Sequence, residues 1–289
     1  MKLDKSTKIG IVGLGLIGGS YAMGLTEKGY EVGAVARRDE TIKYALERKM
    51  ISHGMSKPDP DYISQFDILV FSLYPHAFLE WLDNYQQFIK PGALITDVTG
   101  VKGCVVYDVQ AKLRDDLEFI AAHPMAGRES KGIEYADNTV FHGANYIVTP
   151  TDKNTKEAIE LCKEIGRELG FTRISELTPE KHDEMIGFLS QLTHCIALSL
   201  MTCRDTQNLA EYTGDSFRDL TRIANMNDEM WSELFLLNKT ELLNQMDMFE
   251  DAFRKLRRYI IDGKREEMRE MMRFSTEQRK LFDKPKITE

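Results

Sequence analysis

Cysteine is scarce in this sequence, and the few cysteines are far apart. There are four, and none of them forms a CxxC pair: Cys104, Cys162, Cys195 and Cys203. Such spacing excludes a dense disulfide framework and favours a reducing compartment. The sequence shows no other metal-ligand spacing. We therefore expect a cytoplasmic protein that holds no metal ion.

Long apolar runs and an excess of positive charge are missing too. No uninterrupted apolar run approaches the roughly 20 residues that cross a bilayer, and the first residues lack the apolar region of a signal peptide. Lysine and arginine number 38 against 46 acidic residues, so the net charge is −8. Such a charge balance disfavours binding to nucleic acid or to an anionic membrane. We expect neither as a partner.

Glycine is concentrated where an apolar strand gives way to a helix near the N-terminus. The run Lys8–Val12 leads into Gly13-Leu14-Gly15-Leu16-Ile17-Gly18. In a GxGxxG turn the first glycine permits the bend, the second lets the backbone approach a pyrophosphate, and the third lets helix pack on strand. The start of the helix then offers free N–H groups to phosphate. We predict a dinucleotide cofactor bound by these residues: Gly13, Gly15, Leu16, Ile17 and Gly18.

The end of the next strand, Glu31–Val35, bears on the choice between NADP and NAD. An NAD-binding protein usually places an acid there for the ribose 2′-hydroxyl, but this chain has Ala36 followed by Arg37 and Arg38. Two guanidinium groups can grip a 2′-phosphate. We therefore favour NADP over NAD. Alternatively, both arginines are plain surface charges, or Asp39 binds the ribose, although Asp39 is better placed to cap the following helix.

Strands and helices alternate through the first 177 residues. Apolar runs typical of buried strands occur at 67–73, 93–97, 117–122, 144–149 and 171–175. This alternation predicts a Rossmann-like, doubly wound and mostly parallel α/β sheet over residues 1–177. From Pro179 onward the pattern is almost entirely helical, which predicts an all-α domain over residues 178–289.

Three residues lie at the predicted carboxyl edge of this sheet, where open α/β sheets bind ligands. Ser72 lies at the end of the strand at 67–73 and Pro75 follows it, and both would border the nicotinamide ribose unless they are ordinary loop residues. His123 follows the strand at 117–122. A neutral imidazole accepts a proton near pH 7, so His123 is the candidate general base. The long, glycine-containing loop at 127–143 suits a segment that covers a site.

A predicted helix at 181–203 carries a second histidine. Its apolar stripe is expected to face the core: Ile186, Leu189, Thr193, Ile196 and Leu200. A different face carries Asp183, Gly187, Ser190 and His194 at three- and four-residue spacing. If the helix lies over the nucleotide-binding domain, this face borders the cleft. The alternative is a polar histidine satisfied at an interface.

The rest of the helical half holds two more candidates. Arg218 and Arg222 lie four residues apart beside two aspartates, and an arginine left unpaired next to a cleft is a fork for a carboxylate. Near the C-terminus, four apolar positions predict either core or the face of a partner helix: Phe249, Phe253, Leu256 and Ile260.

Taken in order, these motifs resemble those of the prephenate dehydrogenase family, which includes arogenate dehydrogenases. The resemblance covers about Lys8 to Asn238. It rests on the glycine run, Thr96-Asp97 through Lys102, His123-Pro124-Met125-Ala126-Gly127, Ser190-Gln191-Leu192-Thr193-His194, and Phe217 through Ala224. It implies oxidative decarboxylation of prephenate to 4-hydroxyphenylpyruvate in tyrosine biosynthesis, with hydride transfer to NADP or NAD. It also implies a helical second domain that forms a homodimer.

The resemblance assigns roles residue by residue. His123 matches the histidine that deprotonates the ring C4 hydroxyl during hydride transfer, and His194 matches a second histidine in the substrate pocket. Arg222 matches the arginine that binds a substrate carboxylate. We therefore expect His123 and His194 to be the catalytic residues, and Arg222, Ser190 and Thr99 to bind the substrate.

Two positions depart from the family pattern. Where the family often has a serine that hydrogen-bonds the catalytic histidine, this chain has Gly100, and Thr99 or a water molecule is expected to take over. Thr193 replaces the usual proline one residue before the second histidine, and this predicts a straighter helix.

Three alternatives compete with this interpretation, and two of them stay open. Arogenate is the nearest, because NADP preference and arogenate use often occur together in the family, and the sequence does not decide whether tyrosine inhibits the enzyme. A β-hydroxyacid dehydrogenase would need a catalytic lysine on the first long helix of the second domain, and 182–203 contains none. A catalytically inactive nucleotide-sensing protein would bind the cofactor without turnover.

Overall fold

The computed structural model describes residues 2–128, 130–205 and 207–283. The chain divides into two compact units, the first ending at Lys239 and the second beginning at Thr240. The first unit holds both sheets and every helix up to α10. The second holds α12 and nearly all of α11.

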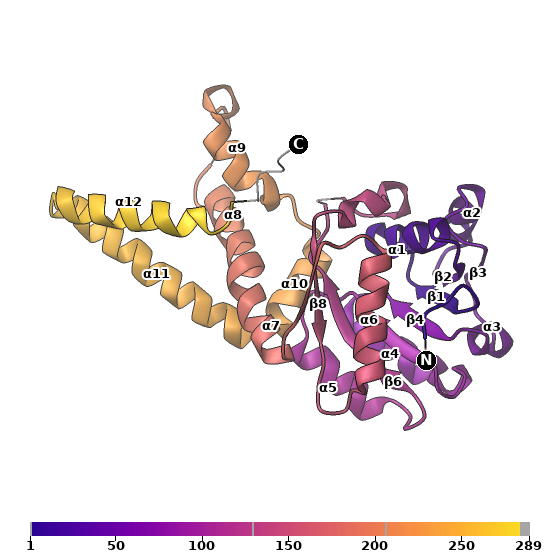
Figure 1. The fold of residues 1–289 in the computed structure, drawn as a ribbon. Helices are drawn as coiled ribbons and strands as arrows, with labels where there is room; N and C mark the ends of the chain where they lie inside the picture. Colours follow the sequence, from indigo (N-terminus) through magenta and orange to yellow (C-terminus); the bar gives the residue numbers. More distant parts are fainter. Residues whose placement is uncertain (1, 129, 206, 284–289) are drawn as a thin grey trace, which may run out of the picture. The chain divides into compact units, whose positions relative to one another are not determined.

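A six-stranded parallel sheet forms the centre of the first unit (Figure 1). Its strands, in the order β3-β2-β1-β4-β5-β6, are His53–Met55, Glu31–Val35, Lys8–Val12, Ile68–Phe71, Leu94–Asp97 and Glu118–Phe119. The strand order changes direction between β1 and β4, and ligands bind at such switch points. The predicted doubly wound sheet is therefore confirmed, although the short edge strand β3 was not expected.

Helices cover both faces of this sheet. They are α1 (Leu16–Glu27), α2 (Asp39–Glu47), α3 (Pro60–Ser64), α4 (Pro75–Tyr85) with the 3₁₀ turn Gln86–Phe88, α5 (Gly103–Lys112) and α6 (Lys156–Glu168). Alternate residues of β4 show why both faces of the sheet need helices. Ile68 and Val70 pack in one apolar cluster, and Leu69 and Phe71 in the other. Because side chains alternate across a strand, a continuous apolar run needs cover on both faces.

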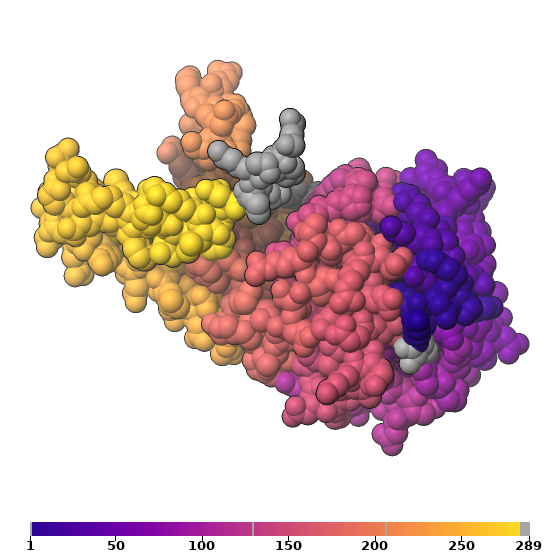
Figure 2. All heavy atoms as spheres, in the orientation of Figure 1, coloured from indigo at the N-terminus to yellow at the C-terminus, as the bar shows by residue number. Residues whose placement is uncertain are grey.

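The predicted strand at 117–122 belongs to two sheets rather than one. The N–H of Ile120 still bonds to the carbonyl of Ile95 at 2.9 Å. The chain then leaves β5 and becomes β7 (Ala121–Pro124), which pairs antiparallel with β8 (Asn145–Thr149), and β8 pairs in parallel with β9 (Arg173–Glu176). His123 therefore lies within a strand, opposite Ile147, and not beyond a strand end as predicted. Residues of α6 pack over this small sheet on the face seen in Figure 2.

The loop expected to cover the site is partly built into the core. Its second half forms two 3₁₀ turns, Ile133–Tyr135 and Asn138–Phe141, in which Ile133 and Phe141 are buried. The N–H of Asp137 also bonds to Ser20 Oγ on α1 at 2.9 Å. The second half of the loop is therefore part of the folded core.

The predicted helix at 181–203 is interrupted. It consists of α7 (Pro179–Ile186), a π-helical turn at Gly187–Leu192 and α8 (Thr193–Thr202). A π turn adds one residue per turn, so burial passes from Ile186 to Gln191 and Leu192, then to Ala197. The expected apolar stripe is therefore wrong beyond Ile186, and Leu189 is 43% exposed. Helix α8 begins at Thr193, and the straighter helix expected from the missing proline stays a prediction.

The same segment has one further property. Among the described helices, Pro179–Thr202 alone has the length and mean hydropathy of a membrane span. It nevertheless carries a buried polar pair, His182 and Asp183. The His182 ring bonds to His123 of β7, and the Asp183 carboxylate accepts the backbone N–H of Lys102. These contacts are those of a helix in a folded core.

In the part of the chain that the structure describes, four short helical segments complete the first unit, and buried amides hold the last of them, α10. The segments are the 3₁₀ turn Ala210–Tyr212, α9 (Asp215–Thr221), the 3₁₀ turn Arg222–Ala224 and α10 (Asp228–Leu237). Gln191 donates to the carbonyl of Leu234 at 3.0 Å, and Asn238 donates to Gln191 Oε1 at 2.7 Å and to the carbonyl of Asp183 at 3.0 Å. These bonds fix α10 against α7.

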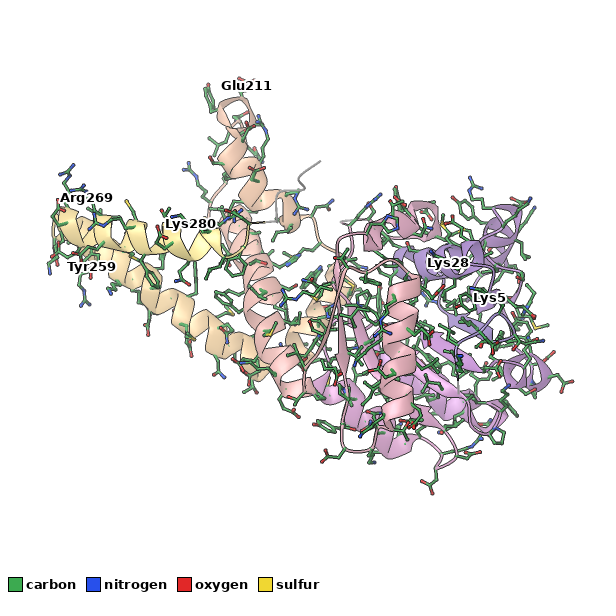
Figure 3. All side chains as sticks on the ribbon, viewed as in Figure 1. Lys5, Lys28, Glu211, Tyr259, Arg269 and Lys280 are labelled. Carbon is green, nitrogen blue, oxygen red and sulfur yellow. The ribbon has the colours of Figure 1, made fainter. Side chains whose placement is uncertain are left out.

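The second unit is a helical hairpin of α11 (Lys239–Ile261) and α12 (Arg265–Lys280). Charged side chains such as Arg269 and Lys280 extend from it (Figure 3). Phe253 and Ile260 are 61% and 62% exposed, so the interpretation of this apolar stripe as core is wrong. Its interpretation as the face of a partner helix stays a prediction.

Candidate active site

The glycine turn has the geometry that a dinucleotide requires. Gly13 has φ +97°, and a Cβ there would lie 2.3 Å from the carbonyl oxygen of Ser72. A Cβ on Gly18 would lie 2.0 Å from the carbonyl oxygen of Gly13. Gly15, by contrast, faces open space, and no side chain caps the helix that it precedes. The α1 N-terminus can therefore take a pyrophosphate, and the residues present fit such a cofactor.

The other predicted cofactor residues surround this turn unequally. The Leu16 side chain is buried and Ile17 is half-buried, so Leu16 can contribute through its backbone. Ser72 lies beside Gly13 and 2.9 Å from a Cβ built on Gly18. Pro75 is the buried first residue of α4. Ser72 is thus next to the turn, whereas Pro75 is buried at the start of α4, and a cofactor contact by either residue stays a prediction.

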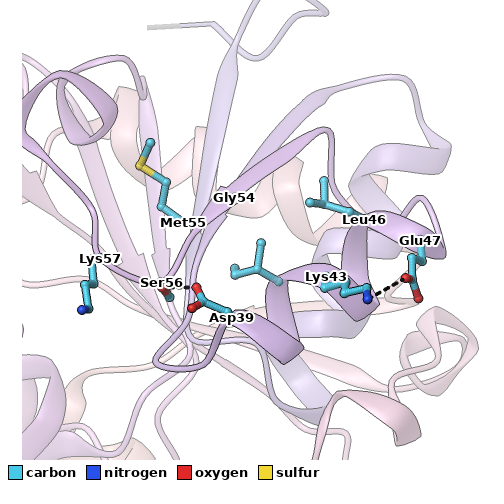
Figure 4. A pocket seen from close by; sticks show the side chains of 9 residues that line it. Asp39, Lys43, Leu46, Glu47, Gly54, Met55, Ser56 and Lys57 are labelled. Atoms are coloured by element: carbon cyan, nitrogen blue, oxygen red, sulfur yellow. Dashed lines mark hydrogen bonds and ion pairs between the residues drawn. The ribbon is translucent and has the colours of Figure 1, made fainter.

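The arginines predicted to select NADP follow β2 directly. The side chains of Arg37 and Arg38 are exposed and form no ion pair with any described residue. Arg38, not Asp39, occupies the cap position of α2. The Asp39 carboxylate instead accepts a hydrogen bond from Ser56 (Figure 4). The capping prediction for Asp39 is wrong because this bond ties its side chain to the loop after β3.

A pocket of about 470 Å³ lies beside that bond. Lys43, Glu47 and Lys57 are among the side chains that line it (Figure 4). It lies at the edge strand β3, and His123 is not among its lining residues. We therefore do not take this pocket as the reaction site.

His123 has the protonation state of a base. Desolvation of its ring, together with the neighbouring His182 and the ammonium group of Lys102, holds the pKa of His123 well below the ordinary value of 6.5. The imidazole is therefore neutral at pH 7. A neutral ring can accept a proton.

A chain of side chains leads away from His123. Its Nδ1 lies 2.9 Å from Nε2 of His182 in α7, and Nδ1 of His182 lies 2.7 Å from Oδ1 of Asp183. The two Asp183 oxygens accept the backbone N–H groups of Lys102 at 2.8 Å and Gly103 at 2.7 Å. The chain thus ends at the α5 N-terminus, whose dipole favours a negative charge.

A buried ammonium group fixes the backbone next to His123. Lys102 is fully buried, and its Nζ donates to Asp97 Oδ2 at 2.7 Å, to Thr99 Oγ1 at 3.1 Å and to the carbonyl of Ala122 at 2.6 Å. The Thr99 hydroxyl also donates to Asp97. The Thr99 hydroxyl therefore bonds to Asp97 and Lys102 and not to His123, so Thr99 does not take the place of the missing serine, and its contact with the substrate stays a prediction.

Helix α10 has residues close to both predicted catalytic histidines. A Cβ built on Gly100 would lie 3.9 Å from Nε2 of His123 and 3.5 Å from Leu234 of α10. One turn earlier on α10, Trp231 stacks on His194 with ring centroids 3.7 Å apart. His194 Nδ1 lies 2.9 Å from the carbonyl oxygen of Ser190. Ser190 thus positions His194 through its backbone, and a substrate contact by the Ser190 hydroxyl stays a prediction.

The two arginines of the helical half are placed differently. Arg218 bonds to Asp215 at 3.0 Å and to the carbonyl of Thr213 at 3.1 Å. Arg222 is exposed, in a 3₁₀ turn that packs against α8, the helix of His194. Arg222 is thus placed beside the His194 helix, and its role in carboxylate binding stays a prediction.

His182 is the site residue that the sequence reasoning missed. The helical pattern singled out Asp183 but not the histidine before it. An adjacent His-Asp pair, in a chain with only six histidines, was the available signal. Within the described residues, no group of His, Cys, Asp and Glu side chains could hold a metal ion.

Two family models together span most of the chain. The nucleotide-binding domain of prephenate dehydrogenase matches residues 22–174, and the prephenate dehydrogenase dimerization domain matches residues 178–274. The chain belongs to the prephenate dehydrogenase family.

Individual family members agree with this assignment. Prephenate dehydrogenase from Bacillus subtilis is 29% identical over 86% of this chain and 69% of its own length. The crystal structure of Aquifex aeolicus prephenate dehydrogenase with hydroxyphenyl propionate and NAD+ is 29% identical, with a TM-score of 0.89 over 98% of this chain and all of that one. Synechocystis arogenate dehydrogenase is 25% identical, with a TM-score of 0.82 over 96% and 100% of the two chains.

Membership in the prephenate dehydrogenase family supports use of a nicotinamide dinucleotide, and the open glycine turn fits one. It also gives the helical segment after residue 178 the character of a dimerization domain. The predicted family resemblance is thus confirmed.

Proposed function

We propose that the chain catalyses the oxidative decarboxylation of prephenate to 4-hydroxyphenylpyruvate. The observation that carries this is the neutral His123, whose Nε2 lies near Gly100 and the side of α10 that also carries the Trp231–His194 stack. A base and an aromatic surface on one side of a helix suit a substrate whose hydroxylated ring must be held and deprotonated.

The electron balance of the reaction sets the task of each residue. The C4–H bond breaks with its electron pair, and the bound nicotinamide dinucleotide supplies the hydride acceptor. His123 takes the C4 hydroxyl proton as the carbonyl forms. The C1–carboxylate bond then breaks to release carbon dioxide, its electrons make the ring aromatic, and the proton returns to the oxygen. A well-placed base contributes roughly 10²–10⁴-fold to such a step.

We assign binding roles to the helical half. His194, held against Trp231, lines the ring pocket, and Arg222 binds a substrate carboxylate as a two-pronged hydrogen-bond donor. Ser190 supports His194 through its carbonyl group. Residues 1–177 then form the dinucleotide-binding domain, and residues 178–289 the substrate and dimerisation domain.

We also propose that the chain prefers NADP and works as a cytoplasmic homodimer. The exposed Arg37 and Arg38 after β2 support the first. The exposed Phe253 and Ile260 support the second, and the four unpaired cysteines suit a reducing compartment.

The cofactor preference is tested by Arg37→Gln combined with Arg38→Gln. Loss of two charge-assisted bonds to the 2′-phosphate should raise KM for NADP about tenfold and leave KM for NAD unchanged. Asp39→Asn is the matched control, because it removes a neighbouring charge that already bonds to Ser56. Equal KM values for NADP in the double variant and the wild type would contradict the proposal.

Four parallel assays test the function itself. Prephenate or arogenate is offered with NAD or NADP, and the reduced nicotinamide is followed by absorbance. We expect the fastest turnover with prephenate and NADP. Faster turnover with arogenate would make the chain an arogenate dehydrogenase. Cofactor binding with no turnover in any assay would identify a nucleotide-binding protein without this activity.

A further inference from the structure

His182 is a buried polar residue with a bond on each ring nitrogen. The side chain is 0% exposed. Its Nε2 lies 2.9 Å from Nδ1 of His123, and its Nδ1 lies 2.7 Å from Oδ1 of Asp183. A neutral imidazole has one donor and one acceptor nitrogen. The direction of one bond therefore fixes the direction of the other.

The direction is set at the carboxylate end. Asp183 accepts backbone N–H groups from Lys102 and Gly103, one on each oxygen, and an ionised carboxylate only accepts. Nδ1 of His182 must then donate to Asp183, so its Nε2 is the acceptor. Nδ1 of His123 donates to that Nε2.

Because both imidazole rings are neutral, each carries one ring proton, and the hydrogen bonds fix which nitrogen holds it. Burial lowers the pKa of His182 and of His123 below the ordinary 6.5. The groups that face the pair are Lys102 at the start of α5, Asp97 at the end of β5, and Asp183 itself. His123 thus carries its single proton on Nδ1, which leaves a lone pair on Nε2. This second nitrogen is 3.9 Å from the Cβ position of Gly100.

We propose that His182 and Asp183 are positioning residues, which hold His123 in the Nδ1-protonated tautomer so that Nε2 receives the substrate proton. This inference rests on the proposed function, because it specifies how the proposed base is oriented. In the other tautomer, Nε2 would carry a hydrogen and could not accept. The pair supplies from α7 the orientation that the chain lacks at Gly100, where glycine has no side chain to bond.

The same geometry accounts for the charge that forms during turnover. When Nε2 takes the proton, His123 becomes an imidazolium whose Nδ1–H still donates to His182. Asp183 then provides the negative charge one ring away. This is the logic of an acid that orients a histidine base, with one imidazole inserted between them.

The exchange His182→Phe removes the acceptor and keeps most of the ring volume. We expect kcat to fall about tenfold or more, with KM for the dinucleotide unchanged. His182→Gln should recover part of the loss, because its carbonyl oxygen can still accept from His123. Nitrogen NMR of histidine-labelled protein should show His123 protonated at Nδ1 in the wild type and in His182→Gln, but not in His182→Phe.

His53→Phe is the matched control. His53 also bonds through Nδ1, to Tyr62 at 2.9 Å, but it lies on the edge strand β3. The same exchange there should leave kcat unchanged. Thermal unfolding and dinucleotide binding of every variant separate loss of positioning from loss of fold.

The double variant His123→Asn with His182→Phe isolates the coupling. If His182 acts only through His123, the double variant is no slower than His123→Asn alone. Losses that multiply, or an unchanged kcat in His182→Phe, would overturn the inference. Normal turnover in His123→Asn would instead overturn the proposed base, and the NMR measurement still decides whether His182 sets the tautomer.

Discussion

The sheet edge and the interrupted helix hold their histidines by different means. At the sheet edge, other elements fix His123: Lys102 bonds to the carbonyl before it, and His182 bonds to its ring. On the helix, His194 bonds to a carbonyl of its own turn and stacks on Trp231. A group that transfers a proton needs its tautomer set from outside. A side chain that lines a pocket for a substrate ring needs only a fixed position, which an aromatic stacking partner can provide.

The largest expected effect comes from breaking the first arrangement. His123→Asn removes the base, and we expect kcat to fall roughly 10²–10⁴-fold while dinucleotide binding is kept. His194→Asn should mainly raise KM for prephenate, because the ring surface is lost but the base remains. Steady-state kinetics of both variants check the contrast. A larger loss of kcat in His194→Asn than in His123→Asn would reverse our assignment of the two roles.

The glycine turn provides a sharper test within the sheet half. Gly18→Ala would place a Cβ 2.0 Å from a backbone oxygen, and such overpacking costs about 1–3 kcal/mol of stability. Gly15→Ala meets no atom within 4 Å, so folding should be unaffected. Its methyl group would nevertheless occupy the space of the pyrophosphate and weaken dinucleotide binding about tenfold.

Thermal unfolding and dinucleotide titration of the two alanine variants are the measurements. Equal Tm values in both would show that the close approach at Gly18 relaxes without cost.

A smaller effect is expected from the stacked pair of the helical half. Trp231→Leu removes the aromatic surface that lies 3.7 Å from the His194 ring centroid. Loss of such a contact costs about 0.5–1.5 kcal/mol of stability, and the less restrained His194 ring should raise KM for prephenate by less than the loss of His194 itself does. Phe235 is the control, since it lies on the same helix and packs against Trp231 at a centroid distance of 5.4 Å. Phe235→Leu should change KM less than Trp231→Leu.

The pH dependence of stability should show the smallest effect. The pKa values of His123 and His182 are lowered in the folded state, so between those values and 6.5 the unfolded chain binds more protons. The free energy of unfolding therefore rises with pH through this window. The stabilisation is complete above pH 6.5 and is lost as the pH falls below it. His182→Phe should have a shallower slope of Tm between about pH 5 and pH 7 than the wild type.

The sequence was most informative where backbone chemistry dictates the residue. The turn at Gly13 and Gly18 admits only glycine for steric reasons, and the apolar runs of β1, β4 and β5 require cover on both faces. These features are local, so the parallel sheet and the cofactor turn could be predicted. His123 was selected for the same reason, as a titratable group directly after an apolar run.

The helical half was less predictable because its pattern depends on distant contacts. The π turn at Gly187–Leu192 shifts burial by one position, and the 3.6-residue period gives no sign of it. Bonds between Gln191, Leu234 and Asn238 hold this irregular turn in place. Likewise, His182 gained a role only when α7 packed beside β7, and no spacing in the sequence brings residue 182 to residue 123.

Lys102 links the sheet half to the helical half through its ammonium group and its backbone N–H. Its ammonium group holds the strand of His123, and its backbone N–H holds the acid that orients His182. Removing one partner of a buried ion pair costs about 3–5 kcal/mol, so a screen for heat resistance would reject most substitutions here. A screen for rate would reject the same substitutions for a different reason. Attempts to make this enzyme more robust would therefore have to begin elsewhere, since at this position durability and speed cannot be selected separately.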